Sequence, residues 1–184
     1  MNLNEMAVTV HQANSKWWQD PATGQPINRN NGELLMLVIT ELAEAVEGIR
    51  KDLMDDKLPH RKMEEVEMAD AFIRLLDYAG GFKLKLDKPD WFKVPAQLDW
   101  PSDNKAECVL MLCAVVTAGH TGFQIPSAIG GHQYEILACL LAIEGYCIKF
   151  NLDLEGAIKE KMEYNRTRAD HTHEARMAAG GKKF

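Results

Sequence analysis

The sequence predicts an all-α protein, in which one chain of 184 residues forms a single helical bundle. Two observations support this class. Apolar residues recur with a period of about 3.6 along most of the chain, as on the buried face of a helix, and no segment alternates apolar and polar residues as a half-buried strand does. The composition, 46% hydrophobic and 26% charged, is typical of a globular protein with one apolar core.

The first two helices are expected on either side of a loop. The first runs from about Asn4 to Trp18, because the residue before Pro21 disfavours helical dihedral angles. A loop rich in Gly, Pro and Asn follows, from Pro21 to Asn31. The second helix runs from about Gly32 to Leu53, and its apolar stripe consists of Leu34, Val38, Leu42, Ala45 and Ile49.

The later helices are predicted by their start and stop signals. Pro59 suits the first turn of a third helix, and Gly80-Gly81 offers its stop signal. Two apolar helices follow, from about Asn104 to Ala118 and from about His132 to Phe150. The sixth helix opens at Asp153, a suitable N-cap, and reaches about Arg168.

Bulk properties limit the partners that this chain can have. We expect one domain over residues 1–184, with an extra helical region over about 82–151 and a polar C-terminal tail over about 169–184. The formal charge of -6 argues against binding of a nucleic-acid polymer. The sequence shows no secretory signal and no apolar stretch long enough to span a bilayer, and its four cysteines form no C-x-x-C pair. We therefore expect a cytoplasmic protein that does not bind membranes.

Acidic residues interrupt the apolar stripes of the second and third helices. Residues three or four apart share one face of a helix, so Glu41 and Glu44 extend into the stripe of the second helix. In the same way, Glu67 and Asp70 extend into the stripe of the third. An ionised carboxylate is costly to bury unless it is paired, protonated or bound to a metal, and Arg74 is the obvious cation on these faces.

Two antiparallel helices joined by a short turn would bring the two acidic pairs face to face. Such an oxygen-rich site has the ligand chemistry of Mg²⁺, for which Mn²⁺ can substitute. The alternative is a solvated acidic face on which the spacing is incidental, since E-x-x-E is common in helices. Two pairs on consecutive helices, both within an apolar stripe, favour the metal site.

The residues around these carboxylates sharpen the pattern. E-L-A-E at Glu41 to Glu44 and E-M-A-D at Glu67 to Asp70 resemble the E-x-x-E…E-x-x-D signature of the all-α nucleoside triphosphate pyrophosphohydrolases, which include MazG-like proteins and dimeric dUTPases. Four longer segments also resemble MazG-like proteins, which are often encoded by phages: Asn14 to Trp18, Glu33 to Arg50, Glu65 to Gly80, and Lys161 to Arg168 followed by G-G-K-K-F. From Ala169 to Met177 the chain departs from the family pattern.

The resemblance implies an enzyme that hydrolyses a (deoxy)nucleoside triphosphate to the monophosphate and pyrophosphate. It also implies a bundle that is completed by oligomerisation, as a homodimer or homotetramer. By the same resemblance Glu41, Glu44, Glu67 and Asp70 are the ligands of Mg²⁺. We expect either Glu41 or Glu44 also to orient or deprotonate the attacking water, and the sequence leaves this choice open.

Substrate ligands are expected on the first and last helices. Lys161 and Asn165 share one helix face, with Arg168 a turn further on, and are candidate phosphate ligands; a basic helix end that complements the helix dipole is the alternative. Lys16 is a second candidate for the phosphates. Trp17 and Trp18 are adjacent, so one of them packs inward and the other can stack on a base; we take Trp18, with His11 and Asn14 at the base edge, as the candidates.

Other classes of helical protein fit the sequence less well. A carboxylate-bridged di-iron bundle uses Glu-x-x-His, which is absent, and the chain has no His-Asp dipeptide for a metal phosphohydrolase of the HD type. The remaining alternative is a non-catalytic helical interaction protein that retains the bundle. It is distinguished by the absence of metal dependence and of pyrophosphate release.

Overall fold

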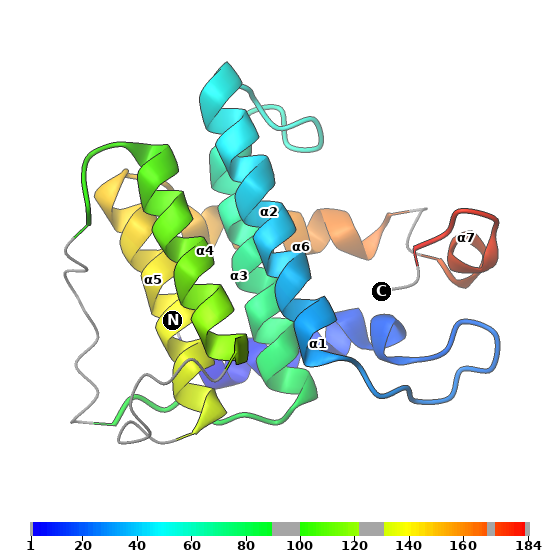
Figure 1. Ribbon diagram of the computed structural model, residues 1–184. Helices are drawn as coiled ribbons and strands as arrows, with labels where there is room; N and C mark the ends of the chain where they lie inside the picture. Colours follow the sequence, from blue (N-terminus) through cyan, green and yellow to red (C-terminus); the bar gives the residue numbers. More distant parts are fainter. Residues whose placement is uncertain (1, 90–99, 122–130, 169–171, 183–184) are drawn as a thin grey trace.

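The computed structural model describes residues 2–89, 100–121, 131–168 and 172–182 (Figure 1). Within these ranges the chain is predominantly helical and has no β-strand, which confirms the predicted all-α class. None of the described helices is both long and apolar enough to cross a membrane. The helices are α1 (Leu3–Asn14), the 3₁₀-helix η1 (Ser15–Trp18), α2 (Asn31–Lys51), α3 (Met63–Gly81), α4 (Lys105–Thr121), α5 (His132–Lys149), α6 (Leu154–Arg166) and α7 (His173–Met177).

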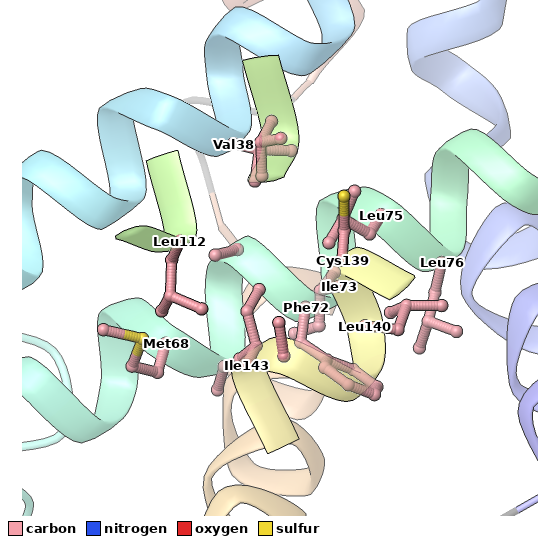
Figure 2. Packing of buried hydrophobic residues seen from close by; sticks show 14 of the residues in the cluster. Val38, Met68, Phe72, Ile73, Leu75, Leu76, Leu112, Cys139, Leu140 and Ile143 are labelled. Carbon is pink, nitrogen blue, oxygen red and sulfur yellow. The ribbon is translucent and has the colours of Figure 1, made fainter. Parts of the chain in front are cut away.

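Helix α3 lies at the centre of the bundle. It packs against α1, α2, α5 and α6, while α4 packs against α2 and α5 (Figure 1). Its side chains are therefore buried on most faces, including Met68, Phe72, Leu75 and Leu76. Figure 2 shows these side chains meeting Val38 of α2, Leu112 of α4, and Cys139, Leu140 and Ile143 of α5. Burial of this apolar surface is the main force that holds α3 in place.

Helices α2 and α3 run antiparallel, as the sequence predicts. Glu41 of α2 is paired with Arg74 of α3, and a Cβ on Gly48 would lie 2.9 Å from Cβ of Met63 at the other end of the pair. A side chain at position 48 would therefore push the two helices apart. The glycine allows the close approach that keeps the acidic residues of both helices within reach of one another.

The expected start of the third helix at Pro59 is wrong. Helix α3 begins at Met63, because the chain between α2 and α3 forms its own hydrogen-bonded turn. The N–H of Met63 donates to the carbonyl of Leu53 at 3.0 Å. The buried carboxylate of Asp55 accepts the backbone N–H groups of Lys57 and Leu58, which fixes the chain before Pro59 in a non-helical path.

Other helix ends differ from the expectations by one turn or less. The first α-helix ends at Asn14 and continues as the 3₁₀-helix Ser15–Trp18. Asp153 is the N-cap of α6, as predicted, and accepts the N–H of Gly156 at 2.9 Å. The tail holds a short helix, α7, that the sequence analysis did not predict. The expected extra helical region over about 82–151 contains α4 and α5, and its residues 90–99 and 122–130 lie outside the described part of the chain.

The Gly80-Gly81 pair ends α3 and also admits the first helix. A Cβ on Gly80 would lie 2.5 Å from the carbonyl oxygen of Ala7 and from Cβ of His11, so α1 crosses α3 directly over this residue. A Cβ on Gly81 would overlap the indole of Trp18. The pair that the sequence suggests as a stop signal therefore also sets the position of α1 and η1.

We predict that Gly80→Ala lowers the free energy of unfolding by about 1–3 kcal/mol, because the added methyl group meets the backbone of α1. The matched control is Gly145→Ala in α5, where the new Cβ has ordinary contact with Trp100 at 3.6 Å. Removal of a helical glycine there raises stability by up to about 1 kcal/mol. Urea unfolding of both variants measures the difference, and equal effects would contradict the crossing at Gly80.

Candidate metal centre and adjoining pocket

Three of the four predicted carboxylates meet between α2 and α3. One carboxylate oxygen each from Glu41, Glu67 and Asp70 lies within 4.8 Å of the other two. Glu41 and Glu67 are 7% and 5% exposed, so these acids lie within the packed part of the molecule and not on a solvated face. The sequence spacing thus predicts a real cluster, because α2 and α3 turn these positions toward one another.

Glu44 lies at the edge of this cluster. It is exposed and one turn along α2 from Glu41, and it does not belong to the group of three oxygens that lie within 4.8 Å of one another. Partial burial, followed by the charge of Glu41, raises the pKa of the Glu44 carboxyl. The fourth predicted ligand is therefore electrostatically coupled to the cluster while remaining open to solvent.

Two cations partly neutralise the cluster. Nε of Arg74 lies 2.5 Å from Oε1 of Glu41, and Nζ of Lys161 lies 2.8 Å from Oδ2 of Asp70. Lys161 is 4% exposed, so its ammonium group is held inside the site. Glu67 is left without such a contact at Oε2, which is buried and has no hydrogen-bond partner among the described residues.

The deficit of positive charge raises the pKa values of the buried acids. Burial, followed by the charges of Asp70 and Glu41, raises the pKa of Glu67 far above its ordinary value. Burial raises the pKa of Asp70 to about 6, although Lys161 acts in the opposite direction. Proximity to Asp70 and Glu67 in turn raises the pKa of Lys161, against the effect of its burial.

The donor set fits a hard divalent cation. Mg²⁺ and Mn²⁺ bind through carboxylate oxygens and water, and the cluster offers three carboxylates, one with a buried oxygen that no described residue contacts by a hydrogen bond. A divalent cation would supply the positive charge that Arg74 and Lys161 do not. Glu41, Glu67 and Asp70 are therefore the residues that could hold it, with Glu44 within electrostatic reach.

A pocket adjoins the cluster and shares Asp70 and Arg74 with it. Its other walls come from α1 and η1, the loop before α2, the first turns of α2, α3, the end of α6 and the C-terminal segment. The positively charged side chains outnumber the two acids, which suits an anionic ligand. The lining residues are Asn14, Trp17, Arg29, Leu34, Leu37, Asp70, Ile73, Arg74, Asp77, Asn165, Arg168 and Lys182.

Three of the predicted substrate ligands line this pocket: Asn14, Asn165 and Arg168. Oδ1 of Asn165 is buried and has no hydrogen-bond partner among the described residues, so it can accept from a ligand. Lys161 points instead to Asp70, within the acidic cluster. Lys16 does not line the pocket, and its backbone carbonyl accepts a hydrogen bond from Arg176.

Trp18 and His11 lie behind the pocket wall instead of lining it. Nε1 of Trp18 donates to both carboxylate oxygens of Asp77, at 3.1 and 3.2 Å, and Nδ1 of His11 lies 2.9 Å from Oδ1 of the same residue. The Trp18 ring also packs edge-on against His11 and Phe82. These two predicted base contacts thus hold Asp77, which does line the pocket, and Trp17 is the tryptophan that borders it.

Arg29 is a pocket residue that the sequence analysis missed. It is 9% exposed, and its Nη1 donates to the carbonyl of Trp17 at 2.7 Å. Its Nη2 is buried and has no hydrogen-bond partner among the described residues. Arg29 comes from a loop without hydrophobic periodicity, so no sequence pattern distinguishes it from a surface arginine.

The raised pKa of Glu67 predicts a pH effect in protein freed of divalent metal. Folded protein keeps the Glu67 proton between its ordinary pKa of 4.5 and about 9, whereas the unfolded chain releases it, so this residue makes stability fall as pH rises through that window. Glu67→Gln removes this contribution. From pH 5 to 8 the variant should gain up to about 4 kcal/mol relative to wild type, at about 1.4 kcal/mol for each pH unit.

Urea unfolding in the presence of chelator at several pH values measures this difference. Glu47→Gln is the control, because Glu47 lies on the same helix as Glu41 but forms surface pairs with Arg50 and Lys51. Its difference from wild type should stay flat over the same range. Parallel pH profiles for wild type and Glu67→Gln would contradict the burial of an unneutralised acid at this position.

Comparisons of the chain with models of protein families, with curated proteins and with solved structures found no match. The chemistry of the acidic cluster and of the pocket beside it is therefore the basis for assigning a function.

Proposed function

We propose that the protein is a Mg²⁺-dependent hydrolase that converts a (deoxy)nucleoside triphosphate to the monophosphate and pyrophosphate. The observation that carries this proposal is the cluster of Glu41, Glu67 and Asp70, in which a buried oxygen of Glu67 has no partner within the described parts of the chain. A pocket with four cationic residues opens directly beside it. Carboxylates that can bind a divalent cation thus lie next to arginine and lysine side chains that can bind an anion. This combination suits a polyphosphate substrate that carries a metal ion.

The chain's own residues account for recognition of the phosphates. Arg74, which pairs with Glu41, and Arg168 line the pocket, and Arg29 brings a buried N–H group that has no partner among the described residues. These groups donate to phosphate oxygens and hold the α-phosphorus next to the carboxylates. Glu41, Glu67 and Asp70 would hold Mg²⁺, which would further neutralise the phosphate charge and lower the pKa of the attacking water.

Of the two glutamates that the sequence left as candidates, Glu44 suits the role of general base better. Glu41 is buried and its Oε1 is already engaged in an ion pair with Arg74. Glu44 is exposed to water and has a raised pKa. A carboxylate with a raised pKa is the stronger base, so Glu44 accepts the proton of the water that attacks the α-phosphorus while pyrophosphate leaves.

The pocket favours Trp17 over Trp18 as the surface for the base. Trp18 is committed to Asp77, whereas Trp17 borders the pocket. A base that stacks on Trp17 can hydrogen-bond to Asn14 and to the buried Oδ1 of Asn165. Stacking on an aromatic ring is open to every base, so selection among bases falls to these amides and to Asp77.

We predict that the purified protein, with Mg²⁺ and each common (d)NTP, yields monophosphate and pyrophosphate from at least one of them. Glu67→Gln and Asp70→Asn should lower kcat/KM by about 100-fold or more, because they remove metal ligands. Glu47→Gln, on the exposed face of α2, should retain activity near that of wild type. Chromatography of the products measures the outcome, and release of diphosphate and free phosphate would contradict the cleavage position.

A separate prediction concerns binding of the metal itself. Mg²⁺ at about 100 times its dissociation constant should raise the free energy of unfolding of wild type by about 2.7 kcal/mol, because it binds only the folded chain. Glu67→Gln should lose most of this gain. A thermal melt with and without chelator measures it. Melting curves indifferent to Mg²⁺ and to Mn²⁺ would favour the alternative, a helical interaction protein in which ion pairs alone hold the acidic cluster.

A further inference from the structure

Lys161 lies deeper in the acidic cluster than Arg74, the other cation that contacts it. The side chain of Lys161 is 4% exposed, whereas that of Arg74 is 39% exposed. Nζ of Lys161 lies 2.8 Å from Oδ2 of Asp70, so the ammonium group occupies one of the two oxygens that Asp70 can offer to a ligand. Burial of an ammonium group is costly unless it is compensated, so the negative charge around Lys161 must hold it there.

Acids from α3 and from the turn before it act on this ammonium group. Burial lowers the pKa of Lys161, but the charges of Asp70, Glu67 and Asp55 outweigh this effect and raise the pKa above its ordinary value. Lys161 therefore stays charged at neutral pH. Its charge in turn opposes the rise in the pKa values of Glu67 and Asp70 that their burial causes. The lysine and the two acids of α3 thus stabilise one another when no metal is bound.

Helix α6 fixes the point from which Lys161 reaches the cluster. It packs against α3, and Figure 1 shows α6 crossing behind that helix. Ala157 and Ile158, about one turn before Lys161, are buried in the apolar core. The backbone at Lys161 is therefore held in place, and the ammonium group can leave Asp70 only by rotation within its flexible four-carbon side chain.

The ammonium group and a divalent cation would need the same acid. Asp70 belongs to the group of three carboxylates that could hold the cation, and it is also the partner of Lys161. A cation among these oxygens would lie next to the ammonium group, because Nζ is already at hydrogen-bond distance from Asp70. Two positive charges in a buried site repel each other strongly, since little solvent screens them. The cation would therefore bind at the expense of the contact between Lys161 and Asp70.

We infer that Lys161 is a built-in competitor of the divalent cation, which lowers the affinity of the acidic cluster for Mg²⁺ by occupying Asp70. This inference rests on the proposed function for the identity of the cation. When no metal is bound, the contact keeps the buried acids partly neutralised, which accounts for a charged lysine among the candidate metal ligands. When a metal is bound, the same charge opposes it, so removal of the charge tightens the binding of the metal.

The test measures binding of Mn²⁺ alone to the full-length protein, at pH 8 and without nucleotide. The electron paramagnetic resonance signal of free Mn²⁺ gives the dissociation constant. In Lys161→Met, which keeps an unbranched side chain but removes the charge, the affinity for Mn²⁺ should rise about tenfold. The control is Lys159→Met, which removes an exposed lysine of the same helix and should bind Mn²⁺ within about twofold of wild type.

A second measurement separates competition from general damage to the fold. In chelator, Lys161→Met should unfold at a lower urea concentration than wild type, because Asp70 loses its partner. Saturating Mn²⁺ should then stabilise the variant by about 1.4 kcal/mol more than it stabilises wild type, which is the tenfold gain in affinity expressed as free energy. Lys161→Gln, which removes the charge but keeps an amide donor, should show both effects in the same direction. If these variants are unfolded in chelator, Mn²⁺ should restore their fold.

The outcomes distinguish this inference from the proposed function. Equal or weaker binding of Mn²⁺ by Lys161→Met and Lys161→Gln, or variants that Mn²⁺ does not refold, overturns the role of Lys161 alone, because the lysine then holds Asp70 in place for the metal. Tighter binding by both variants, together with a wild type that cleaves no triphosphate, supports the inference and overturns the proposed reaction. Wild type and variants that all bind no divalent cation overturn both.

Discussion

The apolar packing of α3 against its neighbouring helices is the constraint on which the acidic cluster between α2 and α3 depends. One oxygen each of Glu41, Glu67 and Asp70 lies within a few ångströms of the others. The two cations that contact these acids, Arg74 and Lys161, neutralise only part of their negative charge. Such an arrangement is unfavourable in isolation and persists because the surrounding fold fixes it. Helix α3 carries two of the three acids and is packed by α1, α2, α5 and α6, so its position is determined by apolar burial and not by the acids themselves.

Helix α3 carries residues of both the acidic cluster and the basic pocket beside it. Asp70, Arg74 and Asp77 follow one another at intervals of four and three residues, and therefore lie along one face of α3. Asp70 belongs to both the cluster and the pocket, Arg74 pairs with Glu41 and lines the pocket, and Asp77 anchors Trp18 behind the wall. One helical face thus orders the acids, the cation and the pocket wall along a line of about two turns.

The sequence predicts the parts of the site that depend on local periodicity. Acidic pairs three residues apart, within apolar stripes, place Glu41, Glu67 and Asp70 in the cluster, because helical geometry alone fixes their face. The same reasoning does not reach Arg29, which comes from a loop and contacts the carbonyl of Trp17. It also cannot choose between Trp17 and Trp18, because that choice depends on the close approach of Trp18 to Gly81, a residue of another helix. Pro59 predicts the wrong start of the third helix for a similar reason, because the turn around the buried Asp55 keeps Pro59 outside α3.

Helix α6 contributes Lys161 and Asn165 to the site, and its position depends on a second set of charges around Arg61, just before α3. Arg61 contacts Glu65 at the start of α3, Asp153 at the cap of α6 and Glu160 within α6. Its side chain is 12% exposed, so these contacts are less screened by solvent than ordinary surface pairs. The N–H of Asp153 also donates to Glu65, at 2.8 Å. Because Glu160 directly precedes Lys161, the contacts of Arg61 fix the rotation of α6 that aims Lys161 at Asp70 and places Asn165, one turn later, in the pocket wall.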